Sequence, residues 1–172
     1  MRLLAILAAT SALAACATPA PPPPAPPPPP AAPPPPPPPP PVAHAPQGPT
    51  PGSVQDFVVN VGDRVYFDYD QYAIRSDAQP VLAAQAAWLS RYQSVRVRIE
   101  GNCDERGTRE YNLALGARRA NSVRDFLVAH GVASGRIETV SFGKEKPIDP
   151  GTGDEAWAHN RNGHTAITAG AM

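Results

Sequence analysis

A proline tract near the amino terminus limits how this chain can fold more than any other feature. The chain has 172 residues and 25 prolines, and all but three of the prolines fall within residues 19–51. Proline donates no backbone hydrogen bond and its ring fixes φ, so a tract of this composition cannot build a core. The stretch that remains, residues 52–172, is about 120 residues long, which suits one compact domain.

The tract itself is typical of polyproline II, which is extended, semi-rigid and rises about 3.1 Å per residue. Fully extended, it would span roughly 100 Å, enough to act as a spacer between an anchor and a distant scaffold. A Pro-rich ligand for an aromatic groove is the alternative. No Lys or Arg flanks the prolines to set the orientation of such a ligand, so the composition favours the spacer.

The first sixteen residues indicate export and lipid attachment. A positive start at Arg2 precedes a short apolar stretch, residues 3–13, which is too short to span a bilayer but suits a secretory signal. It ends in Leu-Ala-Ala-Cys at residues 13–16, which resembles the lipobox of bacterial lipoproteins. The resemblance implies that residues 1–15 are removed and that Cys16 carries acyl chains, each buried methylene adding about 0.8 kcal/mol to anchoring. An ordinary signal peptide with an incidental Cys16 is the alternative.

The composition excludes several classes of function. Lys plus Arg (15) equals Asp plus Glu (15), so no basic field points to nucleic acid or to an acidic lipid surface. Aromatic residues make up 6% and are dispersed, which argues against a platform for stacking bases. Two cysteines are too few for a disulfide framework.

Hydrophobic periodicity predicts the first half of the domain. Residues 64–69 are β-branched and aromatic and predict a strand, and the valines of residues 58–61 suggest a further extended segment before it. Ser76 and Gln79 fit a capping box at the start of a helix, with Pro80 in its first turn. The helix has one apolar face, made by Val81, Leu82, Trp88, Leu89 and Tyr92.

The second half continues the pattern. Residues 95–99 alternate as a half-exposed strand, and a helix capped by Thr108 reaches about His130, with Gly131 ending it. Residues 136–142 predict a third strand and residues 165–168 a weaker last one. The order β-α-β-α-β-β gives the fold class α/β, a two-layer sandwich.

The most informative run is Gly-Asn-Cys-Asp-Glu-Arg-Gly-Thr, residues 101–108, an acidic loop that opens the second helix. Asp104 lies near the helix amino terminus, which favours a carboxylate. Arg118 and Arg119 point about 100° apart, so only one of them can face the loop. A carboxylate beside a guanidinium can hold a zwitterion such as an amino-acid head group. An Asp–Arg ion pair that only stabilises the loop is the alternative, and spacing alone does not separate the two.

This run, together with residues 65–68 and 143–147, closely resembles the peptidoglycan-associated lipoproteins of the Tol–Pal system, which carry an OmpA-like peptidoglycan-binding domain. The resemblance covers roughly residues 64–161. It implies that Asp104 takes the ammonium of meso-diaminopimelate and Arg119 its carboxylate, with Asn112 and Asp70 lining the same pocket. Arg161 is placed in the site too, although the family often has a second arginine where this chain has Asn at position 162.

The same resemblance implies how the chain is divided, where it is located and what it binds. Residues 1–15 would be the signal peptide, 16–52 the lipidated cysteine and spacer, and 53–172 the peptidoglycan-binding domain. The lipid at Cys16 would anchor the chain in the outer membrane with the domain facing the periplasm, and Ala17 favours that membrane because it is not the aspartate that retains enteric lipoproteins in the inner one. The partners implied are peptidoglycan, TolB and other Tol-system proteins, and not nucleic acid. Envelope integrity and outer-membrane constriction in cell division would follow.

Three other functions are weighed. Cys103 with a histidine would suggest a nucleophile pair, but no histidine has an evident orienting partner in the sequence. No spacing of histidines or cysteines suggests a metal site, and no other cofactor is expected. The sequence therefore does not predict an enzyme. A flagellar wall-stator protein would need a transmembrane helix in place of the lipobox. An interaction module whose main partner is another envelope protein remains the second hypothesis.

Replacing the lipobox cysteine tests the anchor. A Cys16→Ser chain should carry no lipid and should no longer float with outer membrane in a density gradient, because the acyl chains supply the anchoring free energy. Metabolic labelling with palmitate checks this: label that persists on the Cys16→Ser chain would contradict the assignment.

Overall fold

The protein was analysed as a computed structural model, which describes residues 48–172. The signal segment 1–15, the lipidation residue Cys16 and the proline tract up to residue 47 lie outside the described residues. Within residues 48–172, no helix is both long and apolar enough to cross a membrane.

Four strands and four α-helices follow one another along the domain. In chain order they are α1 (Val54–Asp56), the π-helical turn η1 (Phe57–Val61), β1 (Arg64–Tyr66), α2 (Gln79–Arg91), β2 (Arg96–Asn102), α3 (Arg109–Ala129), the 3-10 turn η2 (Ser134–Arg136), β3 (Ile137–Gly143), α4 (Asp154–Asn160) and β4 (Asn162–Ala169).

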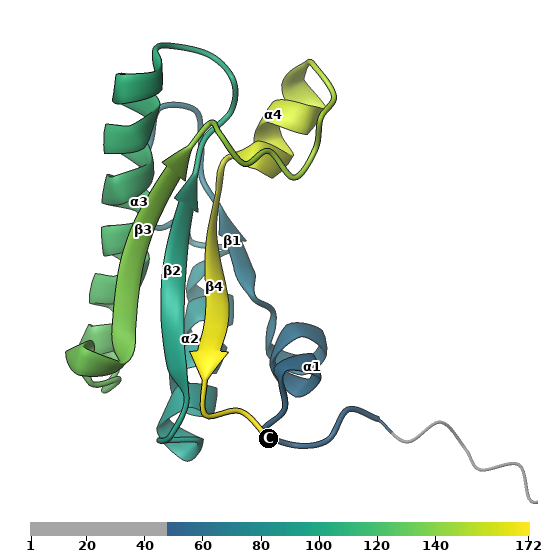
Figure 1. The fold of residues 1–172 in the computed structure, drawn as a ribbon, viewed down its shortest axis with the longest axis vertical. Coiled ribbons are helices and arrows are strands. Elements are labelled where there is room, and N and C mark those ends of the chain that lie inside the picture. Colours follow the sequence, from purple (N-terminus) through teal and green to yellow (C-terminus); the bar gives the residue numbers. More distant parts are fainter. Residues whose placement is uncertain (1–47) are drawn as a thin grey trace, which may run out of the picture. The chain divides into compact units, whose positions relative to one another are not determined.

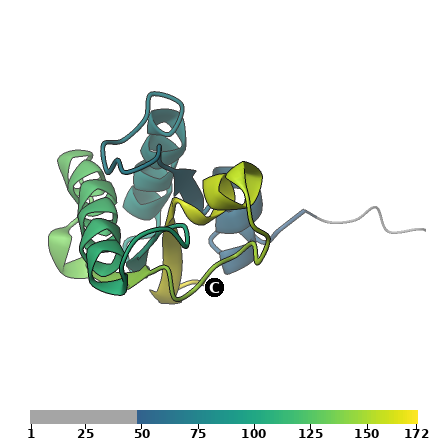
Figure 2. The same ribbon diagram turned by 90° about the horizontal axis from the view of Figure 1, so that it is seen from above.

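The strands form a single sheet in the order β1-β4-β2-β3. The central strand β2 is parallel to β3 and antiparallel to β4, and β4 is antiparallel to β1. The long helices α2 and α3 lie on the same side of this sheet (Figures 1 and 2). The two-layer α/β sandwich and its β-α-β-α-β-β order are therefore confirmed, with α1 added before β1 and α4 inserted before β4.

The alternation of β2 explains where the core lies. Val97 and Ile99 are at most 1% exposed, whereas Arg96 on the opposite face is exposed. Helices α2 and α3 supply Leu89 and Leu127, both fully buried, against the same face. Burying such a side chain stabilises the fold by about 1.5–3 kcal/mol, so the layer between helices and sheet is the main source of stability.

The predicted ends of α3 agree with the structure. The Thr108 hydroxyl accepts a hydrogen bond from the Tyr111 N–H at 3.2 Å, and the chain leaves the helix at Gly131 with φ of 93°, a conformation that favours glycine. For α2, Pro80 lies in the first turn as expected, but the capping box at Ser76 is wrong. The helix begins at Gln79 after Ala78, whose side chain cannot cap it.

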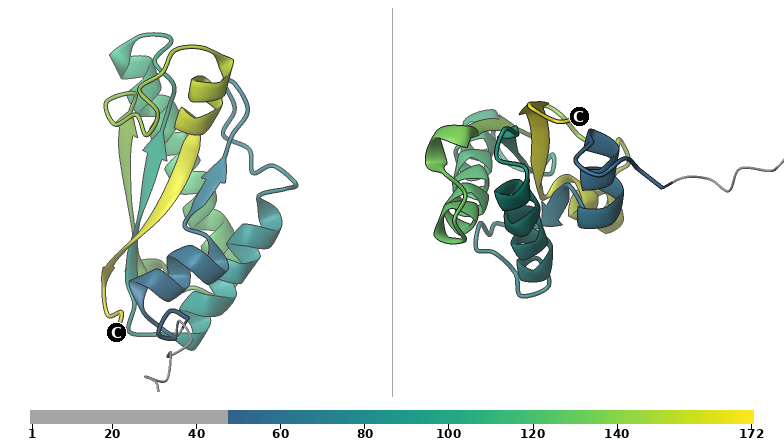
Figure 3. Two further views of the ribbon diagram at one scale, coloured as in Figure 1. Left: turned by 90° about the vertical axis from the view of Figure 1, so that its right-hand side faces the viewer. Right: turned by 90° about the horizontal axis from the view of Figure 1, so that it is seen from below.

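The extended segment predicted at residues 58–61 is also wrong, because this stretch is helical. The Ser53 hydroxyl accepts from the Asp56 N–H, and the Asp56 carboxylate accepts from the Trp88 indole N–H at 2.8 Å. Phe57 packs edge-on against the same indole, with ring centroids 4.9 Å apart. These contacts with α2 outweigh the β preference of the valines, and Figure 3 shows α1 lying beside α2.

The last strand is stronger than its sequence suggests. β4 is eight residues long rather than the four predicted, and it is hydrogen-bonded on both sides, with Gly163 opposite Val65 of β1 and Gly101 of β2. A Cβ at Gly163 would stand 3.1 Å from Val123 of α3. The small residues that weaken the β pattern are therefore what lets an inner strand approach the helix layer.

A contact between two glycines sets the position of α3 over β2. A Cβ built on Gly101 would stand 1.8 Å from the carbonyl oxygen of Gly116, and one on Gly116 would stand 2.7 Å from the Gly101 carbonyl oxygen. The backbones of helix and strand therefore touch at this point. Because Arg119 lies one helical turn beyond Gly116, the same contact fixes where that arginine meets the end of β2.

We therefore expect Gly101→Ala to lower the free energy of unfolding by about 1–3 kcal/mol, since the added methyl must push α3 off the sheet. Chemical denaturation measures the change. Gly135→Ala is the matched control, because nothing lies within 4 Å of a Cβ there, and it should change stability by less than about 0.5 kcal/mol. Equal stability of the two variants would show that α3 does not rest on this contact.

Candidate functional site

The loop after β2, the turn after β1 and α4 lie at the same end of the sheet (Figure 2). A pocket lies where this loop and this turn meet. The pocket encloses about 60 Å³. Its lining residues are Tyr69, Asp70, Cys103, Asp104, Arg106, Gly107, Tyr111, Asn112, Leu115 and Arg119.

The structure brings all five predicted site residues to this place. Asp104, Arg119, Asn112 and Asp70 line the pocket, and Arg161, at the end of α4, donates a hydrogen bond to the Asp104 carboxylate at 3.3 Å. They come from four separate parts of the chain, so their convergence is a property of the fold and not of one local motif.

Asp104 is buried, at 5% exposed, and accepts four hydrogen bonds. Its Oδ1 accepts from the Arg106 backbone N–H and Nε, both at 3.1 Å. Its Oδ2 accepts from Arg106 Nη2 at 2.6 Å and from Arg161 Nη1 at 3.3 Å. Burial by itself raises the pKa of Asp104, but the bonds from the two arginines outweigh it, and the pKa lies below its ordinary value.

Arg119 is fully buried, and main-chain oxygens hold its guanidinium. Nε donates to the Gln71 carbonyl at 2.8 Å, Nη1 to the Asn102 carbonyl at 2.8 Å and Nη2 to the Asp68 carbonyl at 3.1 Å. An arginine carries five N–H donors, so Nη1 and Nη2 each keep one. Burial lowers the pKa of Arg119, yet an arginine stays charged in proteins.

The charge of Arg119 meets no carboxylate in residues 48–172, where none lies within 4.0 Å of its nitrogens. The alternative of an Asp104–Arg119 ion pair is therefore not the arrangement observed, because Asp104 pairs with Arg106 and Arg161 instead. What remains is a buried cation beside a pocket, held by three carbonyl dipoles and lying 5.2 Å from the centre of the Phe67 ring.

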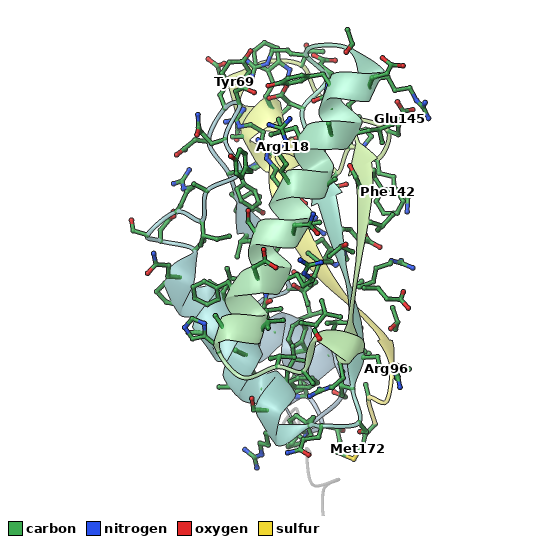
Figure 4. The ribbon with its side chains drawn as sticks, turned by 90° about the vertical axis from the view of Figure 1, so that its left-hand side faces the viewer. Tyr69, Arg96, Arg118, Phe142, Glu145 and Met172 are labelled. Atoms are coloured by element: carbon green, nitrogen blue, oxygen red, sulfur yellow. The ribbon has the colours of Figure 1, made fainter. Side chains whose placement is uncertain are left out.

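The neighbouring Arg118 points elsewhere, as the helical geometry predicts. It is exposed, and its guanidinium lies 5.7 Å from the centre of the Tyr72 ring. Figure 4 places it on the outside of α3, near the end where Tyr69 lies. Only Arg119 of the pair reaches the pocket.

Asn112 and Asp70 shape the walls of the pocket. Asn112 Nδ2 donates to the carbonyls of Arg106 and Thr108 at 2.7 and 3.0 Å, which fixes the amide orientation. None of the hydrogen bonds found within residues 48–172 uses its Oδ1, so that oxygen can accept from a ligand. Asp70 has φ of 56° and accepts from the Tyr111 hydroxyl, which pins the turn after β1 to α3.

Sequence reasoning missed an aromatic clamp on Arg106. The guanidinium carbon lies 4.1 Å from the ring centres of both Tyr69 and Trp157, and the Trp157 indole N–H donates to Glu105 at 2.9 Å. The position of Arg106, two residues after Asp104, was a usable signal for the ion pair. Nothing in the sequence indicates that α4 brings Trp157 across the loop.

Cys103 is 3% exposed, and its thiol donates to the Asn112 carbonyl at 3.3 Å. Burial raises the pKa of the thiol to about 11, so it is protonated at neutral pH. Reactive cysteines have the opposite property, a lowered pKa in a partly exposed site. Cys103 therefore packs the start of the loop as a small residue.

Taken together, the pocket places an anion and a cation side by side under a rim of aromatic rings. Asp104 and Asn112 Oδ1 can accept from an ammonium, while Arg119 can donate two N–H groups to a carboxylate. This is the donor and acceptor pattern of an amino-acid head group.

Comparison with known proteins identifies the family of this chain. The model of the OmpA family matches residues 66–161. The chain is 56% identical over 119 residues to the peptidoglycan-associated lipoprotein of Mesorhizobium japonicum, covering 69% of this chain and 71% of that protein. It is 54% identical over 123 residues to the peptidoglycan-associated lipoprotein of Agrobacterium fabrum, covering 72% and 70%.

Solved structures give the same result. The crystal structure of the peptidoglycan-associated lipoprotein from Burkholderia pseudomallei has a TM-score of 0.60 and 42% identity, covering 62% of this chain and 90% of that one. The C-terminal domain of Helicobacter pylori MotB has a TM-score of 0.58 at 22% identity, covering 62% and 84%, which is a likeness of fold alone. The chain therefore belongs to the OmpA family, and within that family to the peptidoglycan-associated lipoproteins.

Proposed function

We propose that this protein binds peptidoglycan non-covalently by holding the free amino-acid head group of meso-diaminopimelate in the wall's stem peptides. The pocket takes the ammonium on Asp104 and the carboxylate on Arg119, with Asn112 assisting at the ammonium. Arg161 holds Asp104 in place through its hydrogen bond to the carboxylate. Asp70 fixes the turn after β1, which forms another wall of the pocket, through its bond with Tyr111. The names of the relatives support wall association, and the pocket chemistry supports this particular ligand group.

The observation that carries the proposal is the buried, carboxylate-free Arg119 in the same pocket as Asp104. A buried charge without a counter-charge is costly, and here three carbonyl dipoles and the face of the Phe67 ring offset it in place of a carboxylate. An incoming carboxylate that bonds the two remaining N–H groups would supply the missing counter-charge. Lysine, the other common residue at this position of stem peptides, has the ammonium but lacks that carboxylate.

The rest of the chain supplies the anchor in this proposal. Residues 1–15 direct export, residues 16–52 carry the lipid and the spacer, and the domain of residues 53–172 reaches the wall from the outer membrane. The protein would thereby tether the outer membrane to peptidoglycan within the Tol–Pal system, with TolB among its partners. This arrangement serves envelope integrity and outer-membrane constriction during division.

The ligand can be changed while the protein is left intact. Using purified full-length protein in non-ionic detergent, we expect calorimetry to show binding of a tripeptide stem ending in meso-diaminopimelate. The same stem with the terminal carboxylate amidated, or with lysine in its place, should bind more weakly by about 2 kcal/mol or more, because Arg119 loses its charged partner. Equal affinity for the three stems would contradict the proposed role of Arg119.

Protein variants test the other half of the site. Asp104→Ala should largely abolish pull-down by purified sacculi, because the ligand's ammonium is left unpaired. Arg118→Ala is the matched control, since it removes an exposed charge from the adjacent position, and it should leave pull-down unchanged. Arg119→Ala is less informative, because it strands three main-chain carbonyls and should also lower the free energy of unfolding. Undiminished pull-down of a folded Asp104→Ala chain would refute the mechanism.

A further inference from the structure

We propose that Arg106 is a built-in competitor for the ligand: in the free protein its guanidinium occupies the place on Asp104 that the ammonium takes. Ligand binding is then an exchange of cations, and Arg106 determines specificity by admitting only ligands that bring a cation of their own. This inference rests on the proposed function and adds a residue whose role that function does not require.

The acceptor positions on Asp104 are all in use in the free protein. A carboxylate offers about four lone-pair positions, and in this structure four donors already occupy them. Three of the four come from Arg106, namely its backbone N–H, Nε and Nη2, and one comes from Arg161. An ammonium can therefore reach the carboxylate only by replacing a bond that exists.

The volume of the pocket is small compared with the size of an amino-acid head group. The pocket encloses about 60 Å³, whereas an apolar cavity that admits benzene measures about 150 Å³. An amino-acid head group with its Cβ has as many non-hydrogen atoms as benzene. A head group that enters the pocket fully therefore requires some lining group to move.

The Arg106 side chain is the lining group that is able to move. The loop backbone is held firmly, because Lys144 Nζ donates to the carbonyls of Glu105 and Gly107 at 3.0 and 2.7 Å, and Asn112 holds the Arg106 carbonyl. Of the two arginine side chains on Asp104, that of Arg106 is 33% exposed and that of Arg161 only 16%. Arg106 therefore has a path to solvent, while the backbone beneath it stays in place.

The aromatic clamp holds the Arg106 guanidinium in one defined position in the unliganded protein. Tyr69 and Trp157 face its guanidinium from two sides, an arrangement that stabilises a cation. The clamp and the two Asp104 oxygens together hold the Arg106 guanidinium. A neutral or purely anionic ligand has no cation that could replace this guanidinium on Asp104. A ligand with an ammonium restores the lost charge pairing on Asp104 when Arg106 leaves.

The test replaces the competitor. Arg106→Met removes the charge and keeps an apolar side chain against the rings. In full-length protein, calorimetry should show that it binds the stem ending in meso-diaminopimelate about tenfold more tightly than the unmodified chain, the equivalent of one charge-assisted hydrogen bond no longer broken. Arg109→Met is the matched control, because it removes a neighbouring exposed charge that pairs with Glu145, and its affinity should be unchanged or slightly weaker.

The pH dependence supplies a second measurement. Affinity for a cation is lost as pH falls through the pKa of Asp104, which Arg106 holds below its ordinary value. In Arg106→Met the Arg161 bond and the backbone N–H at position 106 still lower that pKa, but the largest lowering contribution is gone. Binding by Arg106→Met should therefore be lost at higher pH than binding by the unmodified chain. A role for Arg106 in loop structure alone would not tighten binding at neutral pH.

The outcomes separate this inference from the proposed function. If the unmodified chain fails to bind the stem, the proposed function fails and this inference with it. If the unmodified chain binds and Arg106→Met binds equally or more weakly, Arg106 is a ligand contact or a bystander, and only the inference is overturned. Should Arg106→Met fail to fold, Arg106→Gln, which keeps a planar polar end group, carries the same expectation.

Discussion

The rest of the structure depends on the bonds of one buried guanidinium. Arg119 extends from α3 and donates to carbonyls in the turn after β1 and at the end of β2, so it joins three segments that are far apart in sequence. Desolvating an arginine is costly, and carbonyl dipoles offset only part of that cost. The same side chain therefore fixes the shape of the pocket and leaves an unmatched positive charge in it. One residue therefore contributes to the stability of the fold and, in the proposed mechanism, to recognition of the ligand.

The acidic side chains around Arg119 already have hydrogen-bond partners in the free protein. Arg106 and Arg161 satisfy Asp104, and the Asp70–Tyr111 bond closes the opposite wall. In the free protein, Asp104 thus has charged partners in Arg106 and Arg161, whereas Arg119 has no carboxylate within 4.0 Å among the described residues. In the proposed mechanism, a ligand with both charges exchanges one pairing and completes another, which would favour an amino-acid head group over simple ions.

Sequence reasoning recovered the parts that local physics determines. The alternation of β2, the Thr108 cap and the angle of about 100° between Arg118 and Arg119 each depend on a few neighbouring residues, and each agrees with the structure. The choice of Asp104 and Arg119 as site residues came from the family resemblance instead. It failed where distant contacts decide the outcome. Residues 58–61 are helical because Asp56 and Phe57 meet Trp88, and β4 is an inner strand because its small residues fit beneath α3. The clamp on Arg106 was missed for the same reason, since it requires α4 to lie across a loop some fifty residues earlier in the chain.

The central claim is that Asp104 and Arg119 hold the two charges of one head group. A crystal structure of the full-length protein with the stem ending in meso-diaminopimelate tests it most directly. The account predicts the ligand's ammonium within hydrogen-bond distance of Asp104 and its carboxylate on Arg119 Nη1 and Nη2, with Arg106 displaced from Asp104. A ligand bound with the head group reversed, or outside the pocket with the Asp104–Arg106 pair intact, would contradict it.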